Sequence, residues 1–294
     1  MRISFKPPDL LSLFFIALLA VLAILGSSPP AAKARMLATY CLFCGATAGL
    51  AWYRGRAGGK RVFYLHIALT VTTILFLFNS LGALIAGVHG RTTYDGALIA
   101  ADYALFGVHP TVWMERLISP ALTTVLQFAY ISYYFIPVSL GVVLVVKGKH
   151  REFESALFGI VLCFYLSYIG YLLVPAIGPR FTLAPLQTIG LRAAPFIRGI
   201  QDFLNGMEQN KTDAFPSGHT AIALMSLYYA RQCGERKLFG ILLPVASALI
   251  FSTVYLRYHY VIDVIAGFIL TGITIALAPF LQVRLSGASR DTGK

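Results

Sequence analysis

Three short polar clusters interrupt a chain that is otherwise largely apolar, and their residue types suit phosphoryl chemistry. They are Gly178-Pro179-Arg180, Phe215-Pro216-Ser217-Gly218-His219, and Arg257-Tyr258-His259 with Asp263. Within or beside a membrane segment, polar groups cost a few kcal/mol each, about 2.5 to 3.5 for a central charge, and so usually carry a function.

The second cluster has the pattern of an anion-binding helix start. Pro216 suits the first turn of a helix, and the N–H groups that follow are free to bind a phosphate. Gly218 allows close approach, Ser217 adds a hydroxyl, and His219 exchanges a proton near neutral pH. The alternative is an ordinary helix cap beside a solvated histidine.

The third cluster pairs an imidazole with a carboxylate. His259 and Asp263 are four residues apart, so they share a face if a helix has begun. Asp263 would then orient the ring and leave its other nitrogen free as nucleophile or base. The alternative is a structural pair that joins two helices.

Two arginines are candidate phosphate ligands. The planar fork of Arg180 can hold two phosphate oxygens, although an interfacial anchor is the alternative. Arg257 faces the same side as His259 only in an extended segment.

Two other chemistries are weaker matches. A Ser–His–Asp hydrolase could use Ser217, His219 or His259, and Asp263, but the chain has no Gly-x-Ser-x-Gly elbow. A metal site from His219, His259 and Asp263 would lack the further carboxylates of a hard-metal phosphatase centre. We therefore expect no metal and no cofactor.

Composition places these clusters in a membrane protein. Of the 294 residues, 57% are hydrophobic and 12% are charged, and the mean hydropathy is +0.73. Soluble domains carry about 25% charged residues. The net charge of +12 comes from basic clusters between apolar runs, a pattern typical of orientation signals, so nucleic acid is not an expected partner.

The apolar runs predict an all-α, polytopic membrane helical bundle with about eight transmembrane helices, a six-helix catalytic core plus two N-terminal helices. The predicted crossings are 10–26, 36–52, 62–88, 120–146, 155–175, 217–230, 238–256 and 260–282. With both termini cytoplasmic, fifteen basic residues fall inside and nine outside, as the positive-inside rule favours. All three polar clusters then lie on the outer face.

Two predicted outer segments are longer than plain turns. Residues 89–119 could form an amphipathic interfacial helix or a connecting loop with an aromatic anchor. Residues 176–216 contain four prolines and should form an irregular cap loop. We expect residues 1–110 to hold N-terminal membrane helices and an outer loop, and residues 111–294 to form the catalytic core.

Together the clusters resemble the type 2 phosphatidic acid phosphatase superfamily of membrane enzymes. Pro216-Ser217-Gly218-His219 matches its second motif, and His259 followed by Asp263 matches its third, over roughly residues 155–282. The resemblance implies His259 as the nucleophile of a phosphohistidine intermediate, Asp263 as its orienting partner, and His219 as the acid. Ser217, Gly218 and Arg180 would bind phosphoryl oxygens, and no metal is implied.

The chain lacks a basic residue of the first motif and another of the third motif of that superfamily. Leu173 stands where the first motif has lysine, and Ser252-Thr253 stands where the third has Ser-Arg. Arg257, Arg192, Arg198 or Lys211 could replace the missing cations, which matter because phosphoryl transfer depends on positioned positive charge.

The expected function is cleavage or transfer of the phosphoryl group of a lipid phosphate at the extracytoplasmic face. The third motif resembles the inositol phosphorylceramide synthase-like branch, which suggests a phosphotransferase that passes a phospho-alcohol to a lipid hydroxyl as an alternative. A non-catalytic transporter of anionic lipids is another. The expected partners are a lipid phosphate and the membrane, with a bacterial inner membrane as location; oligomeric state is open.

Overall fold

The protein is all-α in a computed structural model that describes residues 3–192, 194, 197, 199, 206 and 210–291. Among these residues no β-strand occurs, and an isolated β-bridge joins Ala176 to Asp213. The prediction of a helical membrane bundle is confirmed. The chain forms two compact units, Met1–Arg91 with Ala276–Lys294, and Thr92–Ile275. The predicted division between an N-terminal part, residues 1–110, and a catalytic core, residues 111–294, stays a prediction.

Seven helical stretches within the described part of the chain are long and apolar enough to cross a membrane. They indicate an integral membrane protein. The eighth predicted crossing, 217–230, corresponds to α11 (Gly218–Gln232), which has only 15 residues. The seven stretches are α1 (Pro7–Leu25), α2 (Pro30–Arg54), α3 (Lys60–His89), α6 (Pro120–Ile131) with α7 (Phe135–Val146), α8 (His150–Leu173), α12 (Arg236–Tyr255) and α13 (Val261–Asp291).

The first unit contains α1, α2 and α3, which pack on one another. A buried carboxylate joins all three helices, because Asp9 accepts hydrogen bonds from Arg54 Nη1 at 2.8 Å and contacts His66 Nε2 at 2.9 Å. The backbone N–H of Lys6 also donates to Asp9, at 2.8 Å. An unpaired charge here would be costly, so these partners are what make a buried aspartate tolerable.

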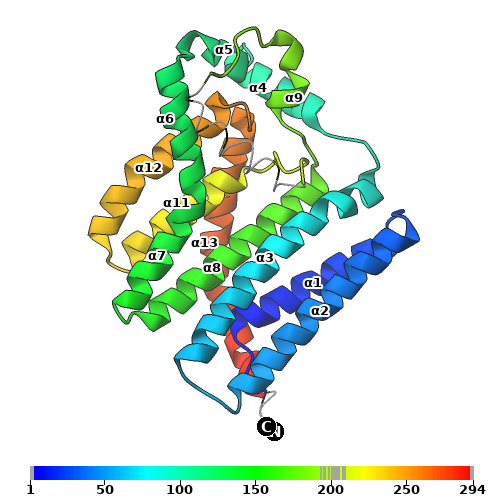
Figure 1. The fold of residues 1–294 in the computed structure, drawn as a ribbon, viewed down its shortest axis with the longest axis vertical. Helices are drawn as coiled ribbons and strands as arrows, with labels where there is room; N and C mark the ends of the chain where they lie inside the picture. Colours follow the sequence, from blue (N-terminus) through cyan, green and yellow to red (C-terminus); the bar gives the residue numbers. More distant parts are fainter. Residues whose placement is uncertain are drawn as a thin grey trace. The chain divides into compact units, whose positions relative to one another are not determined.

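The second unit is built around α11. It packs against α12, α8 and α7, and α12 also packs against α6 (Figure 1). Two glycines of α8 permit the close approach: a Cβ at Gly159 would collide with Tyr229 of α11, and one at Gly170 would collide with Pro216. The contact of Pro216 with Gly170 fixes the start of α11, and an apolar core shared with α6 and α12 holds the rest of the helix.

The predicted crossing at 120–146 is one apolar stretch but two helices. A 3₁₀ turn, η2 (Ser132–Tyr134), separates α6 from α7. Pro137 explains the break, since it has no N–H to donate to the carbonyl of Tyr133 and its ring clashes there. The break places Tyr130 and Tyr133 beside His219 of α11.

The two long connecting segments form short helices at one end of the second unit (Figure 1). The 89–119 segment contains α4 (Asp95–Phe106), α5 (Pro110–Trp113) and η1 (Met114–Leu117), and the other begins with α9 (Pro179–Thr182) and η3 (Ala184–Leu186). Helix α4 buries Asp95, Leu98 and Asp102, whereas the apolar side chains of Leu105 and Phe106 are exposed. Whether it lies in a membrane interface stays a prediction.

Candidate active site

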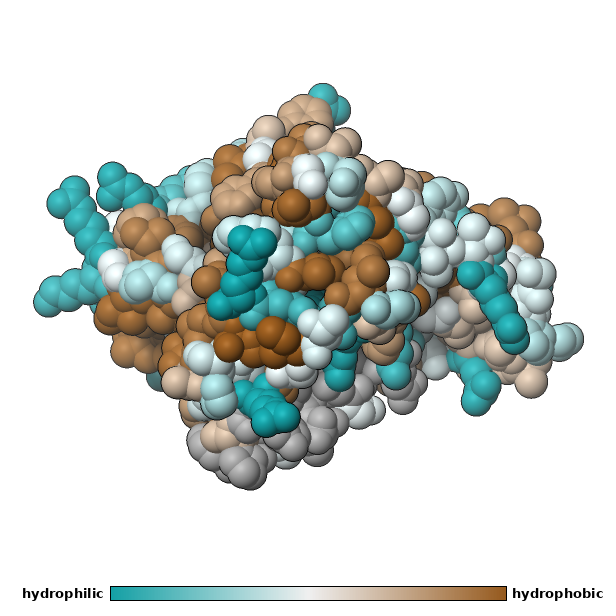
Figure 2. Space-filling view, turned by 90° about the horizontal axis from the view of Figure 1, so that it is seen from above, coloured by the Kyte–Doolittle hydropathy of each residue, from teal (hydrophilic) through white to brown (hydrophobic). Residues whose placement is uncertain are grey.

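A pocket of about 180 Å³ opens at this end of the second unit, and parts of all three polar clusters line it. Pockets for drug-sized ligands usually measure about 300–1,000 Å³, so this one suits a small polar group. Seen from above, hydrophilic residues gather among apolar neighbours (Figure 2). The lining residues are Tyr130, Ile177, Arg180, Phe181, Asn210, Lys211, Asp213, Ala214, His219, Arg257, Tyr258 and His259.

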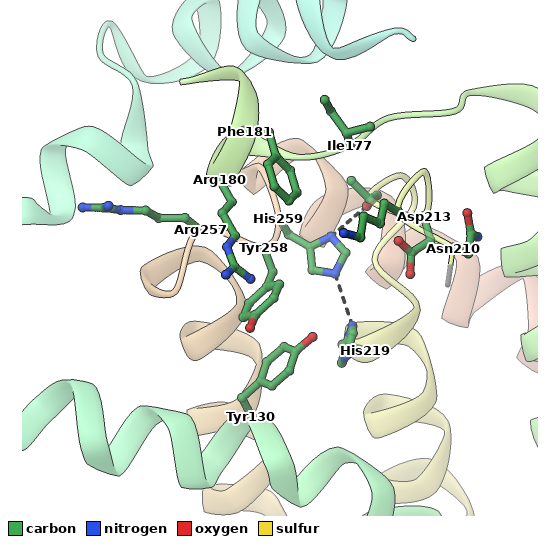
Figure 3. Close-up of a pocket in the computed structure, with 12 residues that line it drawn as sticks. Tyr130, Ile177, Arg180, Phe181, Asn210, Asp213, His219, Arg257, Tyr258 and His259 are labelled. Carbon is green, nitrogen blue, oxygen red and sulfur yellow. Dashed lines mark hydrogen bonds between the residues drawn. The ribbon is translucent and has the colours of Figure 1, made fainter. Parts of the chain in front are cut away.

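The tautomer of His259 is fixed by a backbone carbonyl. Its Nδ1 lies 2.7 Å from the carbonyl oxygen of Ala214. A carbonyl can only accept, so in neutral His259 Nδ1 carries the proton and Nε2 keeps its lone pair. Nε2 points toward the pocket and His219 (Figure 3). His259 as a whole is 3% exposed, so packing also holds this orientation.

Asp263 is a second, longer-range partner of His259. Its Oδ2 lies 3.4 Å from His259 Nδ1 and also accepts the Tyr260 N–H at 2.8 Å. Asp263 is fully buried, and its Oδ1 has no hydrogen-bond partner in the described structure. The structure therefore brings the predicted pair together, but His259 Nδ1 donates at a shorter distance to the Ala214 carbonyl oxygen.

His219 is the second residue of α11 and stands next to His259. The two rings meet through His219 Nδ1 and His259 Nε2, 3.3 Å apart. Tyr133 and Tyr130 pack on the His219 ring with centroids 4.4 and 4.8 Å away, and Tyr130 stacks on Tyr258. His219 is thus held by aromatic faces, which leave its Nδ1 directed at the nucleophile candidate.

Ser217 and Gly218 lie behind the pocket wall. The Ser217 hydroxyl caps α11 by accepting from Thr220 N at 3.3 Å and from Thr220 Oγ1 at 3.0 Å. Gly218 is buried, and a Cβ there would collide with the Tyr171 hydroxyl. Neither residue lines the pocket, so their predicted contacts with phosphate stay a prediction.

Arg180 reaches the pocket because of the turn that precedes it. Gly178 has φ +86°, and a Cβ there would come within 2.6 Å of the Tyr258 carbonyl oxygen, so glycine is required. The Arg180 guanidinium then lies 5.7 Å from the centre of the Tyr258 ring. Arg180 lines the pocket together with His219 and His259. The sequence predicted that these residues lie at the same end of the membrane helices.

Comparison with known proteins agrees with this arrangement. The family profile described as the PAP2 superfamily matches residues 96–277, more than half of the chain. The chain belongs to the PAP2 superfamily. A PA-phosphatase related-family protein of Dictyostelium discoideum is 25% identical over 258 residues, covering 72% of this chain but only 45% of that relative. No solved structure matches.

Membership of the PAP2 superfamily confirms the family predicted from the motifs. The match begins at Gly96, so it includes almost all of α4, which motif-based reasoning passed over. No group of three or more His, Cys, Asp or Glu residues suited to a metal ion occurs in the described residues. Independence from metal remains a prediction.

Arg257, a predicted phosphate ligand, is bound to another partner in this PAP2 protein. Its Nη2 donates to Glu115 Oε1 at 2.8 Å and to the Ile189 carbonyl at 2.6 Å. Glu115 also accepts from Thr188 and Ile189. Burial alone would raise the pKa of Glu115, but these hydrogen bonds and the Arg257 charge together lower it. Arg257 therefore ties the cap loop to the turn that carries His259.

Lys211 is one of the four basic residues expected to replace the missing cations. It lines the pocket, together with Asn210, whose Nδ2 is buried without a partner in the described structure. Arg192 is not among the lining residues described, and Arg198 lies outside the described residues. Only proximity in the fold selects Lys211, because nothing in its sequence context distinguishes it.

Proposed function

We propose that the protein cleaves or transfers the phosphoryl group of a lipid phosphate through a phosphohistidine at His259. The observation that carries this proposal is the orientation of the His259 ring. Its Nδ1 donates a hydrogen bond to the Ala214 carbonyl oxygen, and its Nε2 faces a pocket that Arg180 and His219 also line. A fixed lone pair beside positive charge and a proton donor is what nucleophilic attack on phosphorus requires.

The proposed first step forms one bond and breaks one. His259 Nε2 attacks phosphorus, and the bond from phosphorus to the leaving oxygen breaks as protonated His219 gives that oxygen a proton. Because the two ring nitrogens are 3.3 Å apart, the His219 ring must shift, or phosphorus must approach beside it. In the second step the oxygen of water or an alcohol attacks phosphorus, and neutral His219 takes the proton of that attacking group. The bond from phosphorus to His259 Nε2 breaks, which returns His259 to its starting form.

Arg180 and Lys211 are the proposed phosphate-binding cations. Both line the pocket, and their charges would partly replace the two cations missing from the motifs. The Ser217 hydroxyl accepts a hydrogen bond from Thr220, and Gly218 is buried, so both would fix the start of α11 rather than contact the phosphate. The pocket volume of about 180 Å³ suits the phosphoryl head, while the lipid tail would remain in the bilayer.

A transporter of anionic lipids is the alternative from another class, since it would use the same charges for binding alone. It gives no reason for a fixed His259 tautomer with a second imidazole 3.3 Å from Nε2. A phosphotransferase shares the first step and differs only in the acceptor. The proposed location of the site is the extracytoplasmic face of a bacterial inner membrane.

Purified protein in detergent, assayed for phosphate release and for headgroup exchange with an added alcohol, tests the proposal. His259→Ala should abolish both products, and His219→Ala should lower kcat by about 10² to 10⁴-fold because a general acid is lost. His150→Ala is the matched control, since His150 is an exposed imidazole at the start of α8.

Normal turnover by the His259→Ala protein would exclude a histidine nucleophile. Saturable binding of a lipid phosphate by wild type, without either product across phosphatidic acid and related lipids, would favour the transporter. Exchange into alcohol that exceeds release to water would assign the phosphotransferase.

A further inference from the structure

Helix α4 carries two buried carboxylates on one face, both directed at backbone segments of the active site. Asp95 and Asp102 are 3% and 2% exposed. They are seven residues apart, two helical turns, with Leu98 between them on the same buried face. Leu98 packs in an apolar cluster with Ala176, Leu183, Ala214 and Tyr260, which come from the same active-site segments.

Asp95 holds the turn that leads to Arg180. Its two oxygens accept the N–H groups of Ile177 at 3.0 Å and Gly178 at 2.9 Å. Asp95 Oδ1 also accepts from the Tyr260 hydroxyl at 2.8 Å, which links the turn to the residue after His259. Next to Asp95, the Tyr94 N–H donates to the Pro175 carbonyl at 2.8 Å.

Asp102 holds the start of α13, two residues after His259. Its oxygens accept the N–H groups of Val261 at 2.9 Å and Ile262 at 2.8 Å. The first N–H groups of a helix have no partner within the helix, so a carboxylate there satisfies both and complements the helix dipole. The contact comes from a helix 159 residues earlier in the chain.

We propose that Asp95 and Asp102 are positioning residues of the catalytic site: Asp95 sets the place of the Arg180 turn, and Asp102 sets the place of the His259 segment. The inference rests on the proposed function only for what these segments do. Each carboxylate bridges two consecutive backbone N–H groups, a geometry that a neutral amide cannot reproduce, because its NH₂ would face one of the donors. Asparagine at either position therefore loosens one segment while nearly keeping the side-chain volume.

The first test measures backbone amide hydrogen exchange by mass spectrometry on the purified full chain. Asp95→Asn should raise exchange in the peptide that contains Ile177 and Gly178, and Asp102→Asn in the peptide that contains Val261 and Ile262. Asp9→Asn is the matched control, because Asp9 is an equally buried carboxylate that also accepts several hydrogen bonds, but in the other compact unit. It should leave both peptides unchanged.

The second test separates the two roles by kinetics. Asp95→Asn should mainly raise KM for a short-chain lipid phosphate, since Arg180 binds the phosphate in the proposed mechanism. Asp102→Asn should mainly lower kcat, by about 10- to 100-fold, because a small displacement of a nucleophile has effects of this size. A merely structural role would reduce the amount of folded protein without changing KM or kcat per folded molecule.

The outcomes keep the two proposals apart. Wild-type exchange in the named peptides of both variants would overturn the positioning roles, whatever the activity. Localised exchange with unchanged KM and kcat would also overturn them, because the segments would then not depend on the carboxylates for catalysis. If wild-type protein turned over no lipid phosphate while exchange rose as expected, the proposed function would fail and the structural assignment would stand.

Discussion

The His259 ring depends on a backbone atom that no motif reveals. Every residue has a carbonyl, so the identity of Ala214 carries no chemical signal, and only the fold brings its oxygen within 2.7 Å of Nδ1. The sequence did predict the His259–Asp263 pairing from its spacing. It missed the carbonyl because a contact across 45 residues has no local pattern.

Arg257 is a residue whose role the sequence predicted differently from the contacts that the structure gives it. Its position two residues before His259 made it a candidate phosphate ligand, but the structure places its Nη2 on Glu115. Arg257 has φ +67°, an uncommon backbone conformation for a residue with a side chain. The Glu115 pair and the Ile189 carbonyl hold that conformation in place, and neither partner was singled out by sequence reasoning.

Glu115→Gln should weaken this tie and alter the pH dependence of stability. The pKa of Glu115 is lower in the folded protein than its ordinary value of 4.5, so the carboxylate adds stability above pH 4.5. That contribution disappears as the pH falls below 4.5 through the folded pKa. We therefore expect the wild type to exceed the variant in thermal midpoint at pH 7, with the gap closing toward pH 4.

Thermal unfolding in detergent at pH 4 to 8 measures this difference. Glu152→Gln serves as the control, because Glu152 is an exposed carboxylate in the first turn of α8. A gap between wild type and Glu115→Gln that stayed constant across this pH range would contradict the assignment.

At the scale of elements, helix existence was predictable and helix interruption was less so. Long apolar runs predicted the membrane helices because hydropathy accumulates over about 20 residues. The division between α6 and α7 was missed, although Pro137 was a visible signal, since the run from 120 to 146 remains apolar throughout. The division matters because Tyr133, in η2, packs on His219.

Helix α4 lies in the 89–119 segment, for which the sequence left an interfacial helix and a connecting loop open, and the role of its two aspartates was not predicted. Its sequence, an apolar run with aspartates seven residues apart, was compatible with a surface helix or a loop. Asp95 and Asp102 would be costly to bury unless paired, and their partners are backbone N–H groups of distant segments. Such partners become identifiable only when the chain is folded.

The turn before α9 offers a direct test of how Arg180 is placed. Gly178 has φ +86° and ψ 165°, a backbone region that essentially only glycine adopts, so Gly178→Ala should cost about 1–3 kcal/mol for the backbone alone. The added Cβ would also meet the Tyr258 carbonyl oxygen. We expect kcat/KM for a lipid phosphate to fall at least tenfold. Gly190→Ala is the matched control, because a Cβ there meets nothing within 4 Å and φ is not positive.

Equal kcat/KM values for the two alanine variants would show that the Gly178 turn does not position the phosphate site. Circular dichroism and thermal midpoints of both variants would confirm that the comparison is made on folded protein.

At the scale of the whole molecule, basic residues predict the orientation that hydropathy leaves open. Lys147 and Lys149, in the α7–α8 turn, both pair with Glu235 in the α11–α12 turn. The positive-inside rule places these turns in the cytoplasm and the pocket outside. The structure joins the two turns into one polar cluster through these ion pairs.

Cysteine labelling in intact cells tests this orientation. In a background with Cys41, Cys44, Cys163 and Cys233 replaced by alanine, Gly190→Cys should react with a membrane-impermeant maleimide added outside. Arg151→Cys, at an exposed position next to the α7–α8 turn, should react only after the cells are opened. The reverse pattern would place the pocket in the cytoplasm.

The small volume of the pocket also bears on how the protein would meet its substrates. A pocket of about 180 Å³ has room for a phosphorylated headgroup but not for acyl chains. The protein would therefore discriminate only weakly between lipids that differ in acyl length or saturation. Turnover would then track the mole fraction of each phosphorylated lipid in the surrounding leaflet, and diluting that lipid with an inert one would slow the reaction even at constant bulk concentration.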